Sequence, residues 1–386
     1  MALLRAGLIG LNGIANLHIR EIEGEQTLRL GAVCDTDEDL GLRWQGEQDA
    51  PWYRDYHDIN RSEHCDFVVV ALPHHLHAEV ACDALEAGKP VIIQKPMCIT
   101  VEEADRIIAT AQRTGTKVAT FHTAHLAERD AKAVLDQGFV GDMLRVLYTR
   151  HQSRSMAYYA SGPWRGRWAT EGGGMLTNQY IHDLNRLQYV CGPVTEVVSC
   201  TLANVGHPGM EVEDSCTAVL RFANGAYGEL SLGLYSRPES SGYEITGDRG
   251  CIVARDGERR YADLSSSLTA YLHSRTPAPR RPGGTVTDAA RPDATWQDIP
   301  PVGAAPDALA EFARAIRDDG PAYAPPEVAI QDIELMCALY MAHFRREPVA
   351  IPVPRQEYTA LLHDLAAGKY PSLAWPGPGH PSAPTS

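Results

Sequence analysis

Near the start of the chain, a short glycine-containing segment has the pattern of a pyrophosphate-binding turn. The segment GLNGIA, residues 10–15, follows the apolar run 4–9 directly and precedes a helical pattern. In that context the first glycine allows a sharp turn, and the N–H groups at the start of the helix can bind a pyrophosphate. The pattern therefore predicts a dinucleotide site. The residues expected to contact the cofactor here are Gly10, Asn12, Gly13, Ile14 and Ala15.

The glycine pattern allows two registers. Asn12 stands where a second glycine is usual, which places a side chain close to the phosphates. The alternative register runs through Gly7, Gly10 and Gly13. A glycine turn in a βαβ unit without a ligand has a similar sequence, so the prediction depends on the strand before the turn and the helix after it.

An aspartate follows the second strand-like run, about 20 residues after the glycine turn, where dinucleotide-binding domains place an acidic residue. Asp35 could accept both hydroxyls of the adenosine ribose there. Its carboxylate would repel a 2′-phosphate, and the neighbouring Thr36 and Asp37 provide no arginine to neutralise one. The sequence therefore favours NAD over NADP as the cofactor. A solvated loop carboxylate is the alternative interpretation of Asp35.

Farther along the chain, Asn178 and His182 follow a run of three glycines and are four residues apart. This spacing predicts that both side chains lie on one face of a helix. An imidazole, with an ordinary pKa of about 6.5, suits proton transfer at neutral pH. An amide can orient a substrate but cannot take a proton. A structural histidine is the alternative interpretation of His182.

The elements that must position these residues form two patterns. The first 122 residues alternate short strand-like runs with helical patterns, which predicts a doubly wound parallel sheet of the Rossmann type. The predicted strands are 4–9, 30–34, 67–71, 91–93 and 117–121. A capping box, Thr100 with Glu103, predicts the start of a helix at that point.

The second pattern begins after residue 122 and indicates an α+β domain with a large open, mostly antiparallel sheet. Asn224-Gly225, between two alternating runs, predicts a hairpin. We expect a dinucleotide-binding domain at 1–122 and a domain for substrate binding and oligomerisation at 123–352, with an irregular excursion at 265–301. An extension, 353–386, follows, and its last ten or so residues are expected to be disordered.

Composition excludes several classes of protein. The formal net charge of −14 opposes binding to nucleic acid, and no apolar run is long enough for a membrane helix. The nine cysteines contain no C-x-x-C pair, so we expect reduced core residues. The N-terminus lacks the pattern of a secretory leader, which favours a cytoplasmic location.

Four segments together resemble the glucose-fructose oxidoreductase, inositol 2-dehydrogenase and rhizopine catabolism family, called Gfo/Idh/MocA. They are LPHHLH at 72–77, QKP at 94–96, WR at 164–165 and GGGMLTNQYIH at 172–182. The resemblance covers roughly residues 4–352. It implies a nicotinamide-dependent oxidoreductase with the two-domain fold described above.

The resemblance implies that Lys95 lies beside the nicotinamide and the substrate, since this family has lysine in a Glu-Lys-Pro motif there. A partly buried ammonium can polarise a hydroxyl or, with a lowered pKa, transfer its proton. Gln94 replaces the family's glutamate, which removes an anionic neighbour of Lys95. The family often has aspartate where this chain has Asn178, so the resemblance shifts the proposed proton transfer to His182.

Trp164 and Arg165 are implied to contact the nicotinamide end or the substrate, and Tyr158 is a weaker substrate candidate. His74, His75 and His77 could bind zinc by their spacing. We expect no metal, because family members commonly have a histidine at the His77 position near the cofactor. The residues further expected to contact the cofactor are Leu72, Pro73, His74, His77, Gln94, Lys95 and His122.

The expected function is hydride transfer between NAD and a secondary alcohol or ketone of a sugar, cyclitol or related polyol. One alternative is an NAD-dependent glycosidase or epimerase that oxidises its substrate only transiently. Another is a non-catalytic regulator that senses a sugar or nucleotide. We expect a homodimer or homotetramer, because an open sheet face left exposed would be costly.

Overall fold

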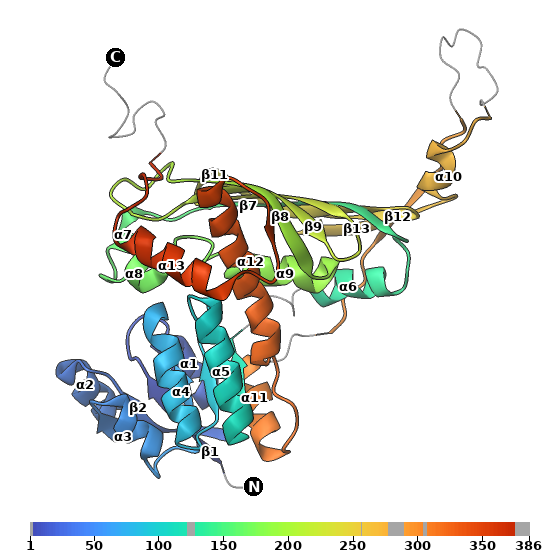
Figure 1. Ribbon diagram of the computed structural model, residues 1–386. Helices are drawn as coiled ribbons and strands as arrows, with labels where there is room; N and C mark the ends of the chain where they lie inside the picture. The colour runs from blue at the N-terminus through green and yellow to red at the C-terminus, as the bar shows by residue number, and fades with distance from the viewer. Residues whose placement is uncertain (1–2, 122–127, 256, 277–288, 304–306, 375–386) are drawn as a thin grey trace.

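The computed structural model describes residues 3–121, 128–255, 257–276, 289–303 and 307–374 (Figure 1). Within these ranges no helix combines the length and the apolar composition needed to cross a membrane. His122 and the end of the predicted C-terminal extension, 375–386, lie outside the described residues, as does 277–288 of the predicted excursion.

The N-terminal part is a six-stranded parallel sheet, which confirms the predicted Rossmann-type fold. The strands are β1 (Leu4–Ile9), β2 (Leu28–Cys34), β3 (Trp52–Tyr53), β4 (Phe67–Val70), β5 (Val91–Ile93) and β6 (Val118–Thr120). Their order is β3-β2-β1-β4-β5-β6. Because the order reverses beside β1, a crevice for a ligand is expected at the carboxyl ends of β1 and β4.

The helices between these strands are α1 (Ala15–Gly24), α2 (Glu38–Gln48), α3 (Tyr56–Arg61), the short 3-10 helix η1 (His74–Leu76), α4 (His77–Glu86) and α5 (Val101–Thr114). Alternation along the strands sends Ile9 and Leu8 into two separate apolar clusters, one on each face of the sheet. The capping box at the start of α5 is confirmed, since the Thr100 hydroxyl accepts from Glu103 N and the Glu103 carboxylate accepts from Thr100 N.

The C-terminal part is a nine-stranded sheet of order β14-β13-β12-β11-β7-β10-β9-β8-β15. Its strands are β7 (Met143–Ser153), β8 (Val194–Ala203), β9 (Ser215–Phe222), β10 (Tyr227–Gly233), β11 (Tyr235–Gly247), β12 (Gly250–Arg255), β13 (Glu258–Leu264), β14 (Ala294–Asp298) and β15 (Val349–Ala350). β7 and β10 run parallel, and the other neighbouring pairs run antiparallel, as predicted. The hairpin at Asn224-Gly225 is also confirmed.

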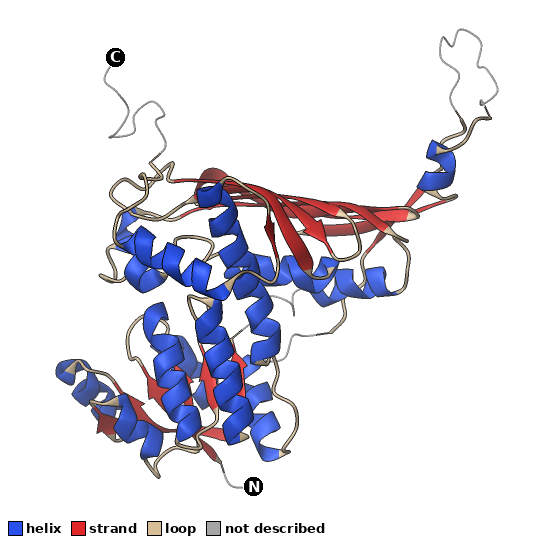
Figure 2. Ribbon diagram, viewed as in Figure 1, coloured by secondary structure: helices blue, strands red, loops and turns tan. Residues whose placement is uncertain are grey.

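Helices cover one face of this sheet, and the described helices leave its other face open (Figure 2). The helices that follow β6 along the chain are α6 (Arg129–Asp136), α7 (Met156–Tyr159), α8 (Trp168–Glu171), α9 (Ile181–Cys191), α10 (Leu268–Leu272), α11 (Ala308–Arg317), α12 (Pro326–Arg345) and α13 (Arg355–Ala366). Of these, α10 lies beyond the end of the sheet and is not part of the layer that covers it (Figure 1). α11 returns to the N-terminal sheet, where Phe312 packs edge-on against Phe67 at 5.9 Å between ring centroids. α10 and β14 fall within the stretch expected to be irregular, and β14 pairs with β13.

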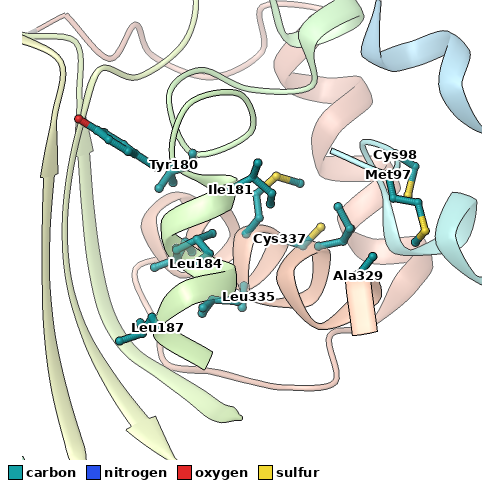
Figure 3. Packing of buried hydrophobic residues seen from close by; sticks show 14 of the residues in the cluster. Met97, Cys98, Tyr180, Ile181, Leu184, Leu187, Ala329, Leu335 and Cys337 are labelled. Carbon is teal, nitrogen blue, oxygen red and sulfur yellow. The ribbon is translucent and has the colours of Figure 1, made fainter. Parts of the chain in front are cut away.

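One apolar cluster continues from the N-terminal part into the C-terminal part. Met97 and Cys98, just after Lys95, are fully buried in the same cluster as Ile181 of α9 and Cys337 of α12 (Figure 3). This packing fixes the end of β5 relative to the start of α9.

Candidate functional site

The glycine turn after β1 has a backbone that only glycine can adopt without strain. Gly10 has φ +94°, and a Cβ there would lie 2.3 Å from the carbonyl oxygen of Ala71. Helix α1 starts at Ala15, which is buried, and no side chain caps its first turn. Asn12, Gly13 and Ile14 are exposed beside this helix terminus. Ala15 N and Leu17 N donate to the main-chain oxygens of Asn12 and Ile14, and a helix terminus without a side-chain cap suits a pyrophosphate.

Asp35 is held beside this turn. One of its carboxylate oxygens accepts from Leu11 N at 2.9 Å, and the other accepts from Asp37 N at 3.0 Å. The carboxylate is only partly buried and so remains accessible. The glycine turn and the Asp35 carboxylate are therefore hydrogen-bonded neighbours at the carboxyl ends of β1 and β2.

The histidines after β4 connect backbone segments. His77 is buried, and its two ring nitrogens lie 2.8 Å from the carbonyl oxygens of Pro96 and Leu72. Burial lowers the pKa of His77 to about 4, so the neutral ring donates to one of them. His74, also buried, contacts the carbonyl oxygen of Glu171 at 2.9 Å. Among the described residues no group of three or more His, Cys, Asp or Glu side chains is placed to hold a metal ion.

Lys95 reaches from the end of β5 into the C-terminal part. Its Nζ donates to the main-chain oxygen of Asn178 at 2.7 Å and to the side-chain Oδ1 of Asn178 at 3.2 Å. Burial lowers the pKa of Lys95 to about 8, and the guanidinium of Arg165 contributes to the same shift. The charge of Glu171 acts in the opposite direction. Gln94 points elsewhere, with its amide nitrogen 2.8 Å from His18 Nε2.

The orientation of the Asn178 amide is fixed by its partners. Nδ2 donates to Glu171 Oε1 at 2.6 Å and to the Tyr158 hydroxyl at 3.2 Å, which leaves Oδ1 for Lys95. Glu171 is fully buried, and burial raises its pKa to about 7. No pattern in the sequence pointed to Glu171, which lies at the end of the four-residue helix α8.

Asn178 is not in the helix that carries His182, contrary to the prediction from their spacing. It lies in a turn before α9, which begins at Ile181. The two side chains nevertheless line one cavity of about 440 Å³, a volume suited to a small ligand. The residues that line it are Lys95, Arg150, Gln152, Arg154, Tyr158, Asn178, Gln179, His182, Asp183 and Arg186.

Trp164 and Arg165 lie behind this lining. Trp164 packs edge-on against His74, at 4.7 Å between ring centroids. Arg165 donates to the Tyr158 hydroxyl at 2.7 Å, and its guanidinium stacks on the rings of Tyr158 and Trp164. Substrate contact by Trp164 and Arg165 stays a prediction.

Comparison with known proteins agrees with the two-part architecture. Residues 4–122 match the model of an oxidoreductase family with an NAD-binding Rossmann fold, and residues 129–253 match the GFO/IDH/MocA C-terminal domain. The chain is 28% identical over 200 residues to the 1,5-anhydro-D-fructose reductase of Ensifer adhaerens. The matched region covers 50% of this chain and 57% of the reductase. It is 29% identical over 161 residues to the inositol 2-dehydrogenase of Salmonella paratyphi B, and that region covers 39% of this chain and 47% of the dehydrogenase.

Similarity to solved structures extends over nearly the whole chain. The WlbA dehydrogenase of Bordetella pertussis, in complex with NADH and UDP-GlcNAcA, superposes with a TM-score of 0.75. That similarity covers 91% of this chain and 100% of the other at 22% sequence identity, so it shows the fold alone.

Proposed function

Because the chain belongs to the Gfo/Idh/MocA family of oxidoreductases, whose N-terminal domain is an NAD-binding Rossmann fold, we propose that it transfers a hydride between NAD and a polyol. The reacting group is the carbinol or keto carbon of a sugar, cyclitol or related compound. One observation carries the proposal: Lys95 from the N-terminal sheet and His182 from α9 line the same cavity. Relatives named as an anhydrofructose reductase and an inositol dehydrogenase support a polyol substrate.

The residues around β1 fit the cofactor. The turn at Gly10 brings the backbone close to the carbonyl oxygen of Ala71, and the uncapped start of α1 would hold the pyrophosphate. Asp35 would accept the hydroxyls of the adenosine ribose. When bound, the nicotinamide ring accepts or supplies the hydride.

The chain's own groups handle the proton of the reacting hydroxyl. Lys95, with a pKa of about 8, is poised to hydrogen-bond the carbinol oxygen and to stabilise charge on it. Asn178 holds the Lys95 ammonium through two oxygens and cannot itself take a proton. We therefore assign to His182 the transfer of the proton that leaves or joins the reacting hydroxyl.

A spectrophotometric screen tests the proposal. The purified protein is incubated with NAD and a panel of sugars and cyclitols, and with NADH and their keto forms, while nicotinamide absorbance is followed. We expect a change with at least one member of the panel. Product formation without net NADH, together with solvent deuterium beside the oxidised carbon, would support the transient-oxidation alternative instead. Tight NAD binding with no chemical change in any compound would contradict both.

Replacement of Asp35 is expected to alter cofactor choice. Asp35→Asn removes the charge that repels a 2′-phosphate and weakens the hydrogen bonds to the ribose, so we expect NAD affinity to fall about tenfold. Affinity for NADP should rise in the same variant. Fluorescence titration of both cofactors measures the ratio. Asp39→Asn, an exposed carboxylate in the first turn of α2, is the matched control. An unchanged ratio in Asp35→Asn would contradict the assigned role.

Glu171 is proposed as a positioning residue for Lys95. Its charge favours the Lys95 ammonium, so Glu171→Gln should move the titration of Lys95 to a pH below about 8. Glu171 carries this charge above a pH of about 7, the range in which Lys95 titrates. We also expect kcat/KM to fall about tenfold, because the Asn178 amide loses its fixed orientation. The pH profile of kcat/KM measures both effects, and an unmoved profile would refute the positioning role.

Self-association through the open sheet face is also proposed. Strand alternation places Leu147, Val219 and Tyr227 on this face, and the Arg145–Glu229 ion pair lies among them. A second copy would cover these apolar groups. Light scattering after size-exclusion chromatography is expected to give the mass of a dimer or tetramer. A monomeric mass at micromolar concentration would contradict this.

A further inference from the structure

The cavity beside Lys95 carries an excess of cationic groups, although the whole chain has a formal net charge of −14. Four cationic side chains and one carboxylate line it: Lys95, Arg150, Arg154, Arg186 and Asp183. The excess is therefore a local feature of this cavity and not a consequence of composition.

One of these arginines is neutralised within the protein. Arg186 Nη1 lies 3.1 Å from Asp183 Oδ1, and its Nε lies 3.1 Å from Glu128 Oε1. The Tyr148 hydroxyl, which donates to Asp183 at 2.6 Å, completes this buried group. Arg186 is thus neutralised by Asp183 and Glu128, whereas Arg150 lies within the electrostatic influence of Asp183 without forming an ion pair with it.

Arg150 and Arg154 have no comparable partner in the described part of the chain. Arg154 donates to the main-chain oxygen of Ser153 at 3.1 Å and stacks over the Tyr158 ring at 5.9 Å. No carboxylate among the described residues forms an ion pair with either guanidinium. Arg150 is partly buried, and a guanidinium withdrawn from water normally gains an acidic partner.

The strand directs both arginines to the same place. Tyr148, Arg150 and Gln152 alternate along β7 and share the face that packs on α9, and Arg154 follows the end of that strand. Arg150 also lines an adjoining cavity of about 170 Å³ with Arg186 and Arg259. In that second cavity Arg186 and Arg259 pair with Glu128, and Arg255 pairs with Glu244, which leaves Arg150 as the lining arginine without an ion pair among the described residues.

We propose that the polyol substrate carries an anionic group, a carboxylate or a phosphate, which Arg150 and Arg154 bind. This inference rests on the proposed hydride transfer. The pyrophosphate of NAD does not account for these arginines, because its predicted site is the start of α1 in the other sheet layer. Guanidinium groups bind carboxylate and phosphate oxygens through paired hydrogen bonds, which a neutral polyol cannot match. Gln152, between them on the same face, can donate to the same group or to a neighbouring hydroxyl.

Calorimetric titration of the NADH-loaded protein tests the inference. The probes are D-glucuronate, D-galacturonate and D-gluconate for the carboxylate, and D-glucose 6-phosphate for the phosphate, with D-glucose and D-galactose as neutral counterparts. We expect at least one charged probe to bind about tenfold or more tightly than its neutral counterpart. Which class binds identifies the anionic group.

Substitutions on β7 identify the site. Arg150→Gln and Arg154→Gln are each expected to weaken binding of that charged probe about tenfold or more. Arg113→Gln is the matched control, because Arg113 is a paired surface arginine on α5 that neither lines the cavity nor lies on the open sheet face. Its affinity for the probe should equal that of the unmodified protein.

Three results would overturn the inference: equal binding of charged and neutral probes, charged-probe binding that survives both substitutions, or no binding by any charged probe. Turnover of a neutral polyol alongside any of these would leave the proposed function standing. Arginine-dependent binding of a charged probe without hydride transfer to or from any polyol would instead count against the proposed function.

Discussion

Lys95→Ala is expected to lower kcat for polyol oxidation about 10³-fold, within the usual range for loss of a group that assists proton transfer. The substitution removes the ammonium that would hydrogen-bond the carbinol oxygen. It also releases both oxygens of Asn178 that Lys95 now holds. Affinity for NAD should change less than kcat, because the substitution leaves intact the turn at Gly10 and the Asp35 carboxylate, which would hold the pyrophosphate and the ribose. Stopped-flow absorbance of NADH and a separate cofactor titration measure the two quantities.

Lys95→Arg tests whether a positive charge alone suffices at this position, since the proton is assigned to His182. Arginine keeps the positive charge but stays protonated at every pH used, so it can polarise the oxygen without exchanging a proton. Lys132→Ala, which affects a lysine paired with Asp136 on α6, is the control for loss of a lysine elsewhere. A kcat within tenfold of the unmodified enzyme in Lys95→Ala would remove this lysine from the proposed chemistry.

His182→Ala is the second large effect, with kcat expected to fall about 10²-fold or more. Asn178 cannot accept a proton, so no neighbouring amide replaces the imidazole. Imidazole added to the assay should restore part of the rate in this variant, because the truncated side chain leaves space in the cavity. The KM for the polyol is expected to change less than kcat.

The control for this prediction is His363→Ala on α13, an exposed histidine that does not line the cavity. Its kcat should match the unmodified enzyme. If His182→Ala kept full activity and also showed no response to imidazole, the proton would have to be assigned to another group.

The sequence was most informative where one residue type was required by the backbone. Gly10 could be recognised because the close approach to Ala71 excludes a side chain. The hairpin glycine, Gly225, could be recognised because its position requires a positive φ, which is +90° in the structure. Thr100 and Glu103 were recognisable for the same reason, since a capping box is a local interaction. The family resemblance, now confirmed, led to Lys95 and His182.

The cavity lining was harder to predict because it depends on which face of a strand is covered. The alternation of Arg150, Gln152 and Arg154 is visible in the sequence, but a strand with charged residues on one face usually exposes that face to water. Only the packing of α9 on β7 turns this face inward. Glu171 was missed because its importance comes from the contact with Asn178, which loop geometry determines.

The position of Asn178 shows a related limit. A four-residue spacing predicts a shared helix face only if both residues are helical, and here the chain turns before α9 begins at Ile181. The return of α11 to the N-terminal sheet also has no local signal, since its apolar face would suit either sheet layer.

A crystal structure of the protein with NADH and a bound polyol tests the central claim most directly. We expect the reacting oxygen within hydrogen-bonding distance of both Lys95 Nζ and the His182 imidazole, with its carbon facing the nicotinamide ring. A polyol bound with that oxygen away from either side chain, or a nicotinamide ring that does not reach the cavity, would contradict the claim.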